Sequence, residues 1–204
     1  LESSNSSSNI AIGYQALLDQ STGASNNAVG YEALRENTTG GDNEAFGYQA
    51  LYSNTTGSSN TAIGHKALLN NTTSDYNTAV GRFCMGENTT GTRNSALGAF
   101  ALDSNTTGQY GTAIGYGALA SATTAENNVA VGYVALNSST TAPRNVAVGA
   151  YALYTSTTAE QNVAIGQAAL QLLTTGNNNT VVGQTAAYTL TTVSYTHLRA
   201  HETR

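Results

Sequence analysis

Apolar residues recur along the chain as two adjacent pairs in every 17 residues, and polar turn sequence follows each pair. One copy reads Asn-x-Ala-apolar-Gly-Tyr-x-Ala-Leu-x-x-Asn-Thr-Thr-Gly-x-x, and its places are numbered from the first Asn. The first place falls on Asn9 and then on every seventeenth residue to Asn179, which makes eleven copies with Gly111 as the one departure from Asn. The fifth-place Gly and the second Thr of the Thr-Thr pair occur in every copy.

This period predicts the fold class. A unit of 17 residues is too short for a repeat of two helices. Two short apolar runs, each followed by Gly-containing polar sequence, predict two short strands joined by turns. We therefore expect an all-β parallel β-solenoid of eleven 17-residue coils over residues 9–192, with residues 1–8 as part of a preceding repeat. At about 4.8 Å between neighbouring strands, the stack would rise roughly 50 Å.

Stacking identical coils places each residue type in a row along the axis. The first-place Asn side chains are expected to hydrogen-bond to one another, as stacked Asn residues do in other cross-strand ladders. The fifth-place Gly is expected where the backbone needs a positive φ or a close approach. Neighbouring strand residues point to opposite faces, so we expect Ile12, Val29 and Ile63 to point inward and Ala11, Ala28 and Ala62 to point outward.

The expected core is thin, with one aliphatic residue, one Leu and two Ala in each coil. Burial of these side chains does not offset the cost of ordering the chain. We therefore expect the outward Ala row to pack against other copies of the chain, with a trimer favoured. The alternative is that each Ala occupies a corner where little space exists.

Composition excludes several classes of function. The formal net charge is −5 and the chain has no run of Lys and Arg, so no nucleic-acid partner is expected. No continuous apolar stretch is long enough to span a membrane. Apolar residues make up 40% of the chain and follow a strict schedule, which argues against disorder.

No catalytic, cofactor-binding or metal-binding residues are predicted, and no enzyme, because nothing departs from the repeat in a way that suggests convergent catalytic groups. The carboxylates that would suit calcium occupy four different places in the repeat: Asp19, Asp42, Asp75 and Asp103. Cys84 and Met85 replace Ala and Leu in one copy and are expected in the core. His65 is expected to be a surface variant of the sixth place.

Two other residue sets allow more than one interpretation. The sixth-place residues Tyr14, Tyr31, Tyr48, Tyr116 and Tyr133 are expected to form an aromatic stripe, either as surface packing or as a platform for sugars. Five copies match the N-glycosylation sequon, at Asn37, Asn54, Asn71, Asn88 and Asn105. The alternative for these five is a turn in which Asn and Thr form hydrogen bonds.

The repeat resembles two groups of known proteins. The motif Asn-x-Ala-[Ile/Val]-Gly-x-x-Ala is similar to the head repeats of trimeric autotransporter adhesins, a left-handed parallel β-roll in which three chains associate. The longer form, with Gly-Tyr-x-Ala-Leu and Asn-Thr-Thr-Gly, resembles repeat regions of phage-type tail fibres and large environmental surface proteins. The resemblance covers residues 9–192 and implies a left-handed homo-oligomer on a cell surface, on a virion or outside the cell.

The C-terminal segment departs from the repeat. Val193–Thr203 resembles the translation of a transposase sequencing adapter, as found at the ends of metagenomic reading frames. Residues 193–204 are therefore expected to be a non-native tail. His197, His201 and Glu202 have a spacing that could hold zinc on a helix, and the adapter interpretation makes this spacing an artefact.

Three functions remain open at this stage. The leading one is a structural shaft or fibre segment of an adhesin-like or tail-fibre-like appendage, with cell-surface glycans bound by some part outside this sequence. The second is a subunit of a fibril that grows end to end. The third is an ice- or glycan-binding solenoid that uses the Thr-Thr row, for which we expect only one Thr of each pair to face outward.

Overall fold

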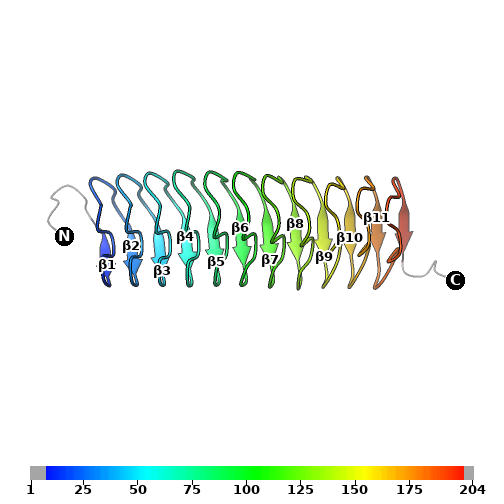
Figure 1. Ribbon diagram of the computed structural model, residues 1–204, viewed down its shortest axis with the longest axis horizontal. Helices are drawn as coiled ribbons and strands as arrows, with labels where there is room; N and C mark the ends of the chain where they lie inside the picture. Colours follow the sequence, from blue (N-terminus) through cyan, green and yellow to red (C-terminus); the bar gives the residue numbers. More distant parts are fainter. Residues whose placement is uncertain (1–7, 200–204) are drawn as a thin grey trace.

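The computed structural model describes residues 8–199 as a single stack of coils with one short strand in each (Figure 1). All twelve strands belong to one parallel sheet whose order follows the sequence. The strands are β1 Ile10–Ile12, β2 Asn27–Val29, β3 Glu44–Phe46, β4 Thr61–Ile63, β5 Thr78–Val80, β6 Ser95–Leu97, β7 Thr112–Ile114, β8 Val129–Val131, β9 Val146–Val148, β10 Val163–Ile165, β11 Thr180–Val182 and β12 His197–Arg199.

Every strand pairs with the next one at an offset of one repeat. Ala28 pairs with Ala45, and Ala45 pairs with Ala62, so each place in the repeat lies beside its own copies along the axis. Figure 1 shows the ends of the described chain at opposite ends of the stack. This confirms the all-β parallel solenoid with coils of 17 residues, whereas the left-handed winding and the trimer stay predictions.

The second strand expected in each coil is absent from the described residues. The Ala-Leu pair lies instead in a turn in which the seventh and ninth places have left-handed φ, for example 53° at Glu32 and 49° at Leu34. In a strand, Ala33 and Leu34 would point to opposite faces, but here both are fully buried. The turn backbone still bonds between coils, since the Leu34 N–H donates to the Ala50 carbonyl at 3.0 Å.

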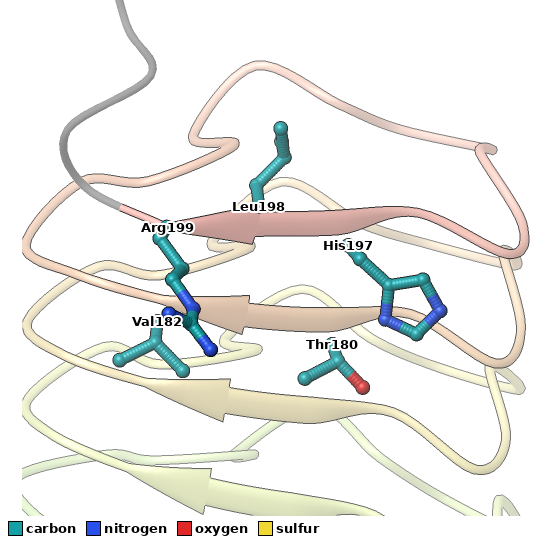
Figure 2. A pocket seen from close by; sticks show the side chains of 5 residues that line it. All are labelled: Thr180, Val182, His197, Leu198 and Arg199. Carbon is teal, nitrogen blue, oxygen red and sulfur yellow. The ribbon is translucent and has the colours of Figure 1, made fainter.

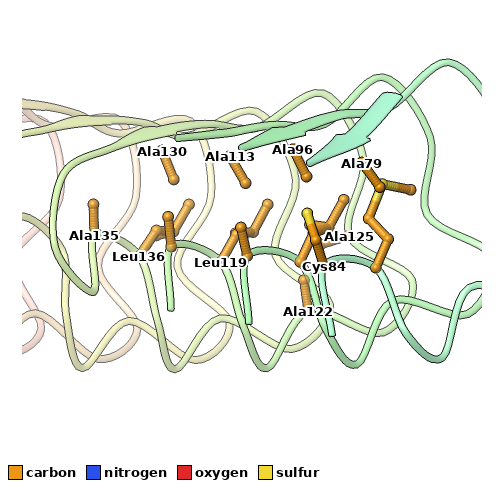
Figure 3. Packing of buried hydrophobic residues seen from close by; sticks show 14 of the residues in the cluster. Ala79, Cys84, Ala96, Ala113, Leu119, Ala122, Ala125, Ala130, Ala135 and Leu136 are labelled. Carbon is orange, nitrogen blue, oxygen red and sulfur yellow. The ribbon is translucent and has the colours of Figure 1, made fainter. Parts of the chain in front are cut away.

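The predicted orientation of the strand residues is wrong. The third-place Ala points into the coil and the fourth-place residue points out: Ala45 is 0% exposed, whereas Phe46 is 40% and Ile63 is 42% exposed. In Figure 3, the strand residues Ala96, Ala113 and Ala130 face the interior that Leu119 and Leu136 occupy from the opposite wall. Because the Leu row fills much of this interior, the strand side holds small side chains, namely Ala in β1–β10 and the buried Val181 in β11.

The interior also contains two rows of Asn. The first-place Asn side chains are buried and bond in series, since the backbone N–H of Asn60 donates to Oδ1 of Asn43 at 3.0 Å. Nδ2 of Asn60 donates across its own coil to the Ser74 carbonyl at 2.8 Å. The predicted Asn ladder is therefore confirmed, and it also satisfies backbone groups that the narrow coil buries.

The fifth-place Gly has both properties that the sequence suggests. Gly98 has a φ of 135°, which L side chains rarely adopt, and a Cβ there would lie 2.5 Å from the Gly115 carbonyl oxygen. The same arrangement occurs in each of these glycines from Gly13 to Gly166. A side chain at this place would separate two coils.

Residues 193–199 continue the stack, contrary to the expectation that the repeat ends at 192. β12 pairs with β11, and the backbone N–H of Thr196 donates to Oδ1 of Asn179 as an Asn would. A parallel sheet edge offers backbone groups to whatever chain follows, whether or not that chain carries the repeat motif. This pairing does not bear on the origin of residues 193–204.

Candidate functional site

Two rows of side chains cover the outer side of the sheet and form what we call the strand face. They come from the second and fourth places of β1–β11, which flank the inward third-place residue of each strand, Ala in β1–β10 and Val181 in β11. The fourth place is apolar in each of β1–β11, and several of its residues are strongly exposed, among them Leu97 at 51% and Ile114 at 40%. No residue of either row is buried in these strands.

The strand face carries no charged residue from β4 to β11. Its outward residues there are aliphatic or hydroxyl-bearing: Thr61, Ile63, Thr78, Val80, Ser95, Leu97, Thr112, Ile114, Val129, Val131, Val146, Val148, Val163, Ile165, Thr180 and Val182. A polar pair precedes this band, where Nδ2 of Asn27 donates to the Glu44 carboxylate at 2.8 Å. A long apolar surface without charge is unusual for a protein that has no partner.

An aromatic row runs along the stack at the sixth and seventh places. Tyr14, Tyr31 and Tyr48 stack in sequence with ring centroids 5.1–5.2 Å apart, and His65 stacks on Tyr48 at 5.1 Å. The contacts continue along the later coils through Phe83, Phe100, Tyr116, Tyr133 and Tyr151. Tyr151 also contacts Tyr154, which stands at the tenth place of the same coil. The predicted aromatic stripe is confirmed, and His65 belongs to it.

Sequence reasoning missed the members of this row at the seventh place. Where the sixth place holds Arg82, Ala99 or Ala150, the next residue is aromatic: Phe83, Phe100 or Tyr151. This exchange between adjacent places is visible in the sequence and is the signal that could have found them. The guanidinium of Arg82 lies over the Phe83 and Phe100 rings, at 5.1 and 5.7 Å.

The stacking bears on the sugar-platform interpretation. A sugar stacks on the face of an aromatic ring, but the faces of Tyr31 lie against Tyr14 and Tyr48. Later in the row the contacts alternate between stacked pairs, such as Tyr116 and Tyr133, and edge-on pairs, such as Phe100 and Tyr116. The geometry therefore favours packing along the stack as the role of this row.

The Thr-Thr pairs lie on a different side of the coil, between inward-facing residues at the twelfth and fifteenth places. Thr55 is half-buried and Thr56 is exposed. The hydroxyl of Thr38 donates to the Thr55 carbonyl at 2.9 Å, and the backbone N–H groups of Thr38 and Thr39 donate to the same oxygen. The expectation that one Thr of each pair turns inward is wrong, because this segment is a bend rather than a strand.

The five sequon asparagines form the second interior row. Asn37, Asn54, Asn71, Asn88 and Asn105 are 0–1% exposed. Nδ2 of Asn54 donates to Oδ1 of Asn37 at 2.7 Å and to the Gly57 carbonyl at 2.9 Å. This is the hydrogen-bonded turn given above as the alternative, and an amide held in this way cannot carry a glycan without leaving the coil.

The titratable and nucleophilic residues show no convergent site in the described part of the chain. Burial raises the pKa of the Cys84 thiol to about 12, so the thiol stays protonated and unreactive at neutral pH. Burial, together with the nearby Glu87, raises the pKa of Asp103. Across residues 8–199, no three His, Cys, Asp or Glu side chains lie close enough together to hold a metal ion.

One pocket lies at the C-terminal end of the stack, over β11 and β12. Figure 2 shows Thr180, Val182, His197, Leu198 and Arg199 around it. Three of these residues belong to the segment that resembles an adapter, so the pocket supports no functional argument. His201 and Glu202 of the zinc-like spacing lie outside the described residues.

Within residues 8–199, no helix is long and apolar enough to cross a membrane. No family model, curated protein or solved structure matches this chain. The strand face, the aromatic row and the Thr rows therefore have to be interpreted from their own geometry.

Proposed function

We propose that this β-solenoid repeat protein is a structural shaft, a rigid segment of an extracellular or virion-borne fibre of adhesin-like or tail-fibre-like kind. The observation that carries the proposal is the unbroken register of the sheet, in which every strand from β1 to β11 pairs with the next at an offset of one repeat. Such a stack holds its two ends apart at a distance set by the number of coils. It acts mechanically and requires no catalytic group.

Electron microscopy of the purified chain tests this proposal. A shaft predicts discrete rods roughly 50 Å long for eleven coils at about 4.8 Å each. Insertion of one further 17-residue unit, a copy of residues 60–76, should lengthen the rod by one coil and leave it folded. Compact particles would overturn the proposal, and filaments of unlimited length would favour the end-to-end fibril instead.

One observation favours a second candidate, the ice- or glycan-binding solenoid. Both residues of each Thr-Thr pair lie outside the coil interior, so the surface carries two adjacent Thr rows rather than one. A regular, uncharged array of methyl and hydroxyl groups suits a ligand that is itself periodic. Growth of ice crystals in the presence of the protein is the test, with Thr107→Lys and Thr124→Lys together as the variant that should abolish any effect.

A further inference from the structure

We infer that the seventh coil, residues 111–127, encloses buried water that bonds to groups which interior amides satisfy in other coils. This coil is the one copy without Asn at the first place, and its twelfth place is Ala122. Gly111 and Ala122 put a hydrogen atom and a methyl group where Asn94 and Asn105 put two amides in the sixth coil. The inference concerns the coil interior and goes beyond the proposed shaft.

The backbone around the seventh coil keeps the spacing of the rest of the stack. The strands β6, β7 and β8 pair in the common register. The N–H of Ser95 donates to the Gly111 carbonyl and the N–H of Thr112 donates to the Asn128 carbonyl, each at 2.8 Å. The coil therefore does not contract around its smaller side chains. The methyl group of Ala125, at an interior place that is Gly in the sixth coil (Figure 3), fills only part of the volume of two amides.

Two buried acceptors face the seventh coil without the donors that their counterparts have. Oδ1 of Asn105 has no hydrogen-bond partner, whereas Oδ1 of Asn88 accepts from Nδ2 of Asn105 at 2.7 Å. In the sixth coil, the Gly108 carbonyl accepts from Nδ2 of Asn94 at 2.9 Å and from Nδ2 of Asn105 at 3.1 Å. Ala125 is the counterpart of Gly108, and the small first-place and twelfth-place residues of its coil supply neither donor.

A buried donor faces the same interior from the eighth coil. Along the first-place row, each backbone N–H donates to Oδ1 of the preceding Asn, as Asn145 does to Asn128 at 2.8 Å. The N–H of Asn128 follows Gly111 in this row and therefore has no such acceptor. A buried water typically forms about three hydrogen bonds to groups that are otherwise unsatisfied. Water can donate to Oδ1 of Asn105 and to the Ala125 carbonyl and accept from the Asn128 N–H.

The chemistry of these groups favours water over an ion. The set combines two acceptors with a donor and carries no charge, so it suits neither a cation nor an anion. Oγ of Ser139, the twelfth-place residue that follows Ala122 along the row, is also buried without a partner. A hydroxyl group can bond to water as donor or as acceptor. Water is therefore the ligand that matches every group around this interior.

Nuclear Overhauser effects from water to the backbone amides of the full, deuterated and isotope-labelled chain test the inference. The Asn128 amide should show a contact with long-lived water, whereas the Asn145 amide, which bonds to Oδ1 of Asn128, should show none. Gly111→Asn restores the first-place acceptor with the residue that stands in every other copy. This variant should abolish the water contact at Asn128.

Thr112→Asn is the matched control. It adds the same side chain one residue later, on the outer side of the strand, where Asn27 stands in β2. It also removes a neighbouring hydroxyl group, whose exchangeable proton would give the same signal as water. The contact at Asn128 should persist in this variant.

Hydrogen exchange gives a second measurement on the same amides. In wild type, the Asn128 amide should exchange at least about tenfold faster than the Asn145 amide, and Gly111→Asn should remove this difference. A wild-type Asn128 amide without a water contact would overturn the inference, whether or not the variant folds. A contact that Gly111→Asn leaves unchanged, or one that Thr112→Asn removes, would overturn it as well. None of these results bears on the shaft, which depends on the register of the sheet.

Discussion

Gly98 shows what one residue contributes to the stack. Its φ is 135°, and a Cβ at this position would lie 2.5 Å from the Gly115 oxygen, so a side chain meets both backbone strain and a steric clash. Gly98→Val should lower the free energy of unfolding by at least about 2 kcal/mol. Urea denaturation measures this loss.

Gly41 provides the control for that substitution. It has no positive φ, and its counterparts in other coils include Ala24, Ser58 and Thr92. Gly41→Ala should therefore leave the stability within about 0.5 kcal/mol of wild type. Equal effects of the two substitutions would show that the fifth place is an ordinary position.

Gly111 interrupts the first-place Asn ladder. Its backbone N–H still donates to Oδ1 of Asn94 at 2.8 Å, but Gly111 has no side chain to offer to Asn128. Gly111→Asn should restore the series and raise the free energy of unfolding by about 1 kcal/mol. A destabilised variant would mean that the coil has adapted to Gly, and calorimetry on wild type and variant distinguishes the two results.

At the scale of the element, the side-chain sizes at the twelfth and fifteenth places of the turn vary together: a large residue at one place accompanies a small residue at the other. Coils with Asn at the twelfth place mostly have Gly at the fifteenth. The coils with Ala122, Ser139 and Ser156 at the twelfth place have Ala at the fifteenth. A Cβ on Gly108 would lie 2.4 Å from the Ala125 carbonyl oxygen and 2.5 Å from Oδ1 of Asn105, and only the second contact depends on the residue at the twelfth place. The corner of each coil therefore has room for one large group.

A double-mutant cycle tests this exchange. Gly108→Ala alone should be destabilising because the new Cβ clashes with the Ala125 carbonyl oxygen and with Oδ1 of Asn105, and removal of the Asn105 side chain relieves the second clash. Asn105→Ala with Gly108→Ala should be less destabilised than the two single effects together predict, with a coupling of about 1 kcal/mol. Additive effects on the melting curves would show that the two places are independent.

Some features of a single coil could be predicted from the sequence and others could not. The 17-residue period predicts one coil per repeat, and the invariant Gly predicts the close approach, because both follow from stacking identical units. The sequence does not predict which face of the strand is buried, because an Ala-apolar pair satisfies the alternation rule in either orientation. The orientation of the strand depends on Leu119 and its counterparts in the other coils. Their left-handed φ directs the Leu side chains into the interior that the strand also faces.

The C-terminal segment is a single element whose contribution to folding can be tested. β12 adds one further strand, but its neighbour β11 already pairs with β10 on its other side. Deleting residues 193–204 should therefore leave the coils of residues 9–192 stacked, with an unchanged circular dichroism spectrum per residue. Loss of that spectrum would show that the tail is required for folding.

At the scale of the whole molecule, the residues on the outer surfaces can be assigned only when the residues that point into the coil are known. The aromatic stripe could be predicted because Tyr recurs at one place. The strand face could not, because the exposure of Ile63 or Ile114 depends on the inward orientation of the Ala beside it. The prediction that the chain associates with its own copies stays a prediction, and the Ala row that was expected to form the contact is buried inside the coil.

The distance between labelled coils tests the central claim most directly. Cysteines placed at Thr39 and at Thr107, Thr141 or Thr175 in a Cys84→Ala background carry spin labels at the same place of coils four, six and eight repeats apart. Ala occupies the place of Cys84 in the other coils, so this background keeps the repeat intact. Labelled protein is diluted with unlabelled protein so that only distances within one chain are measured.

A stack predicts distances that rise linearly with the number of coils, to about 19, 29 and 38 Å at roughly 4.8 Å per coil. Double electron–electron resonance measures all three. A distance for the pair at Thr39 and Thr175 that is no longer than that for Thr39 and Thr107 would contradict the solenoid, and with it the shaft.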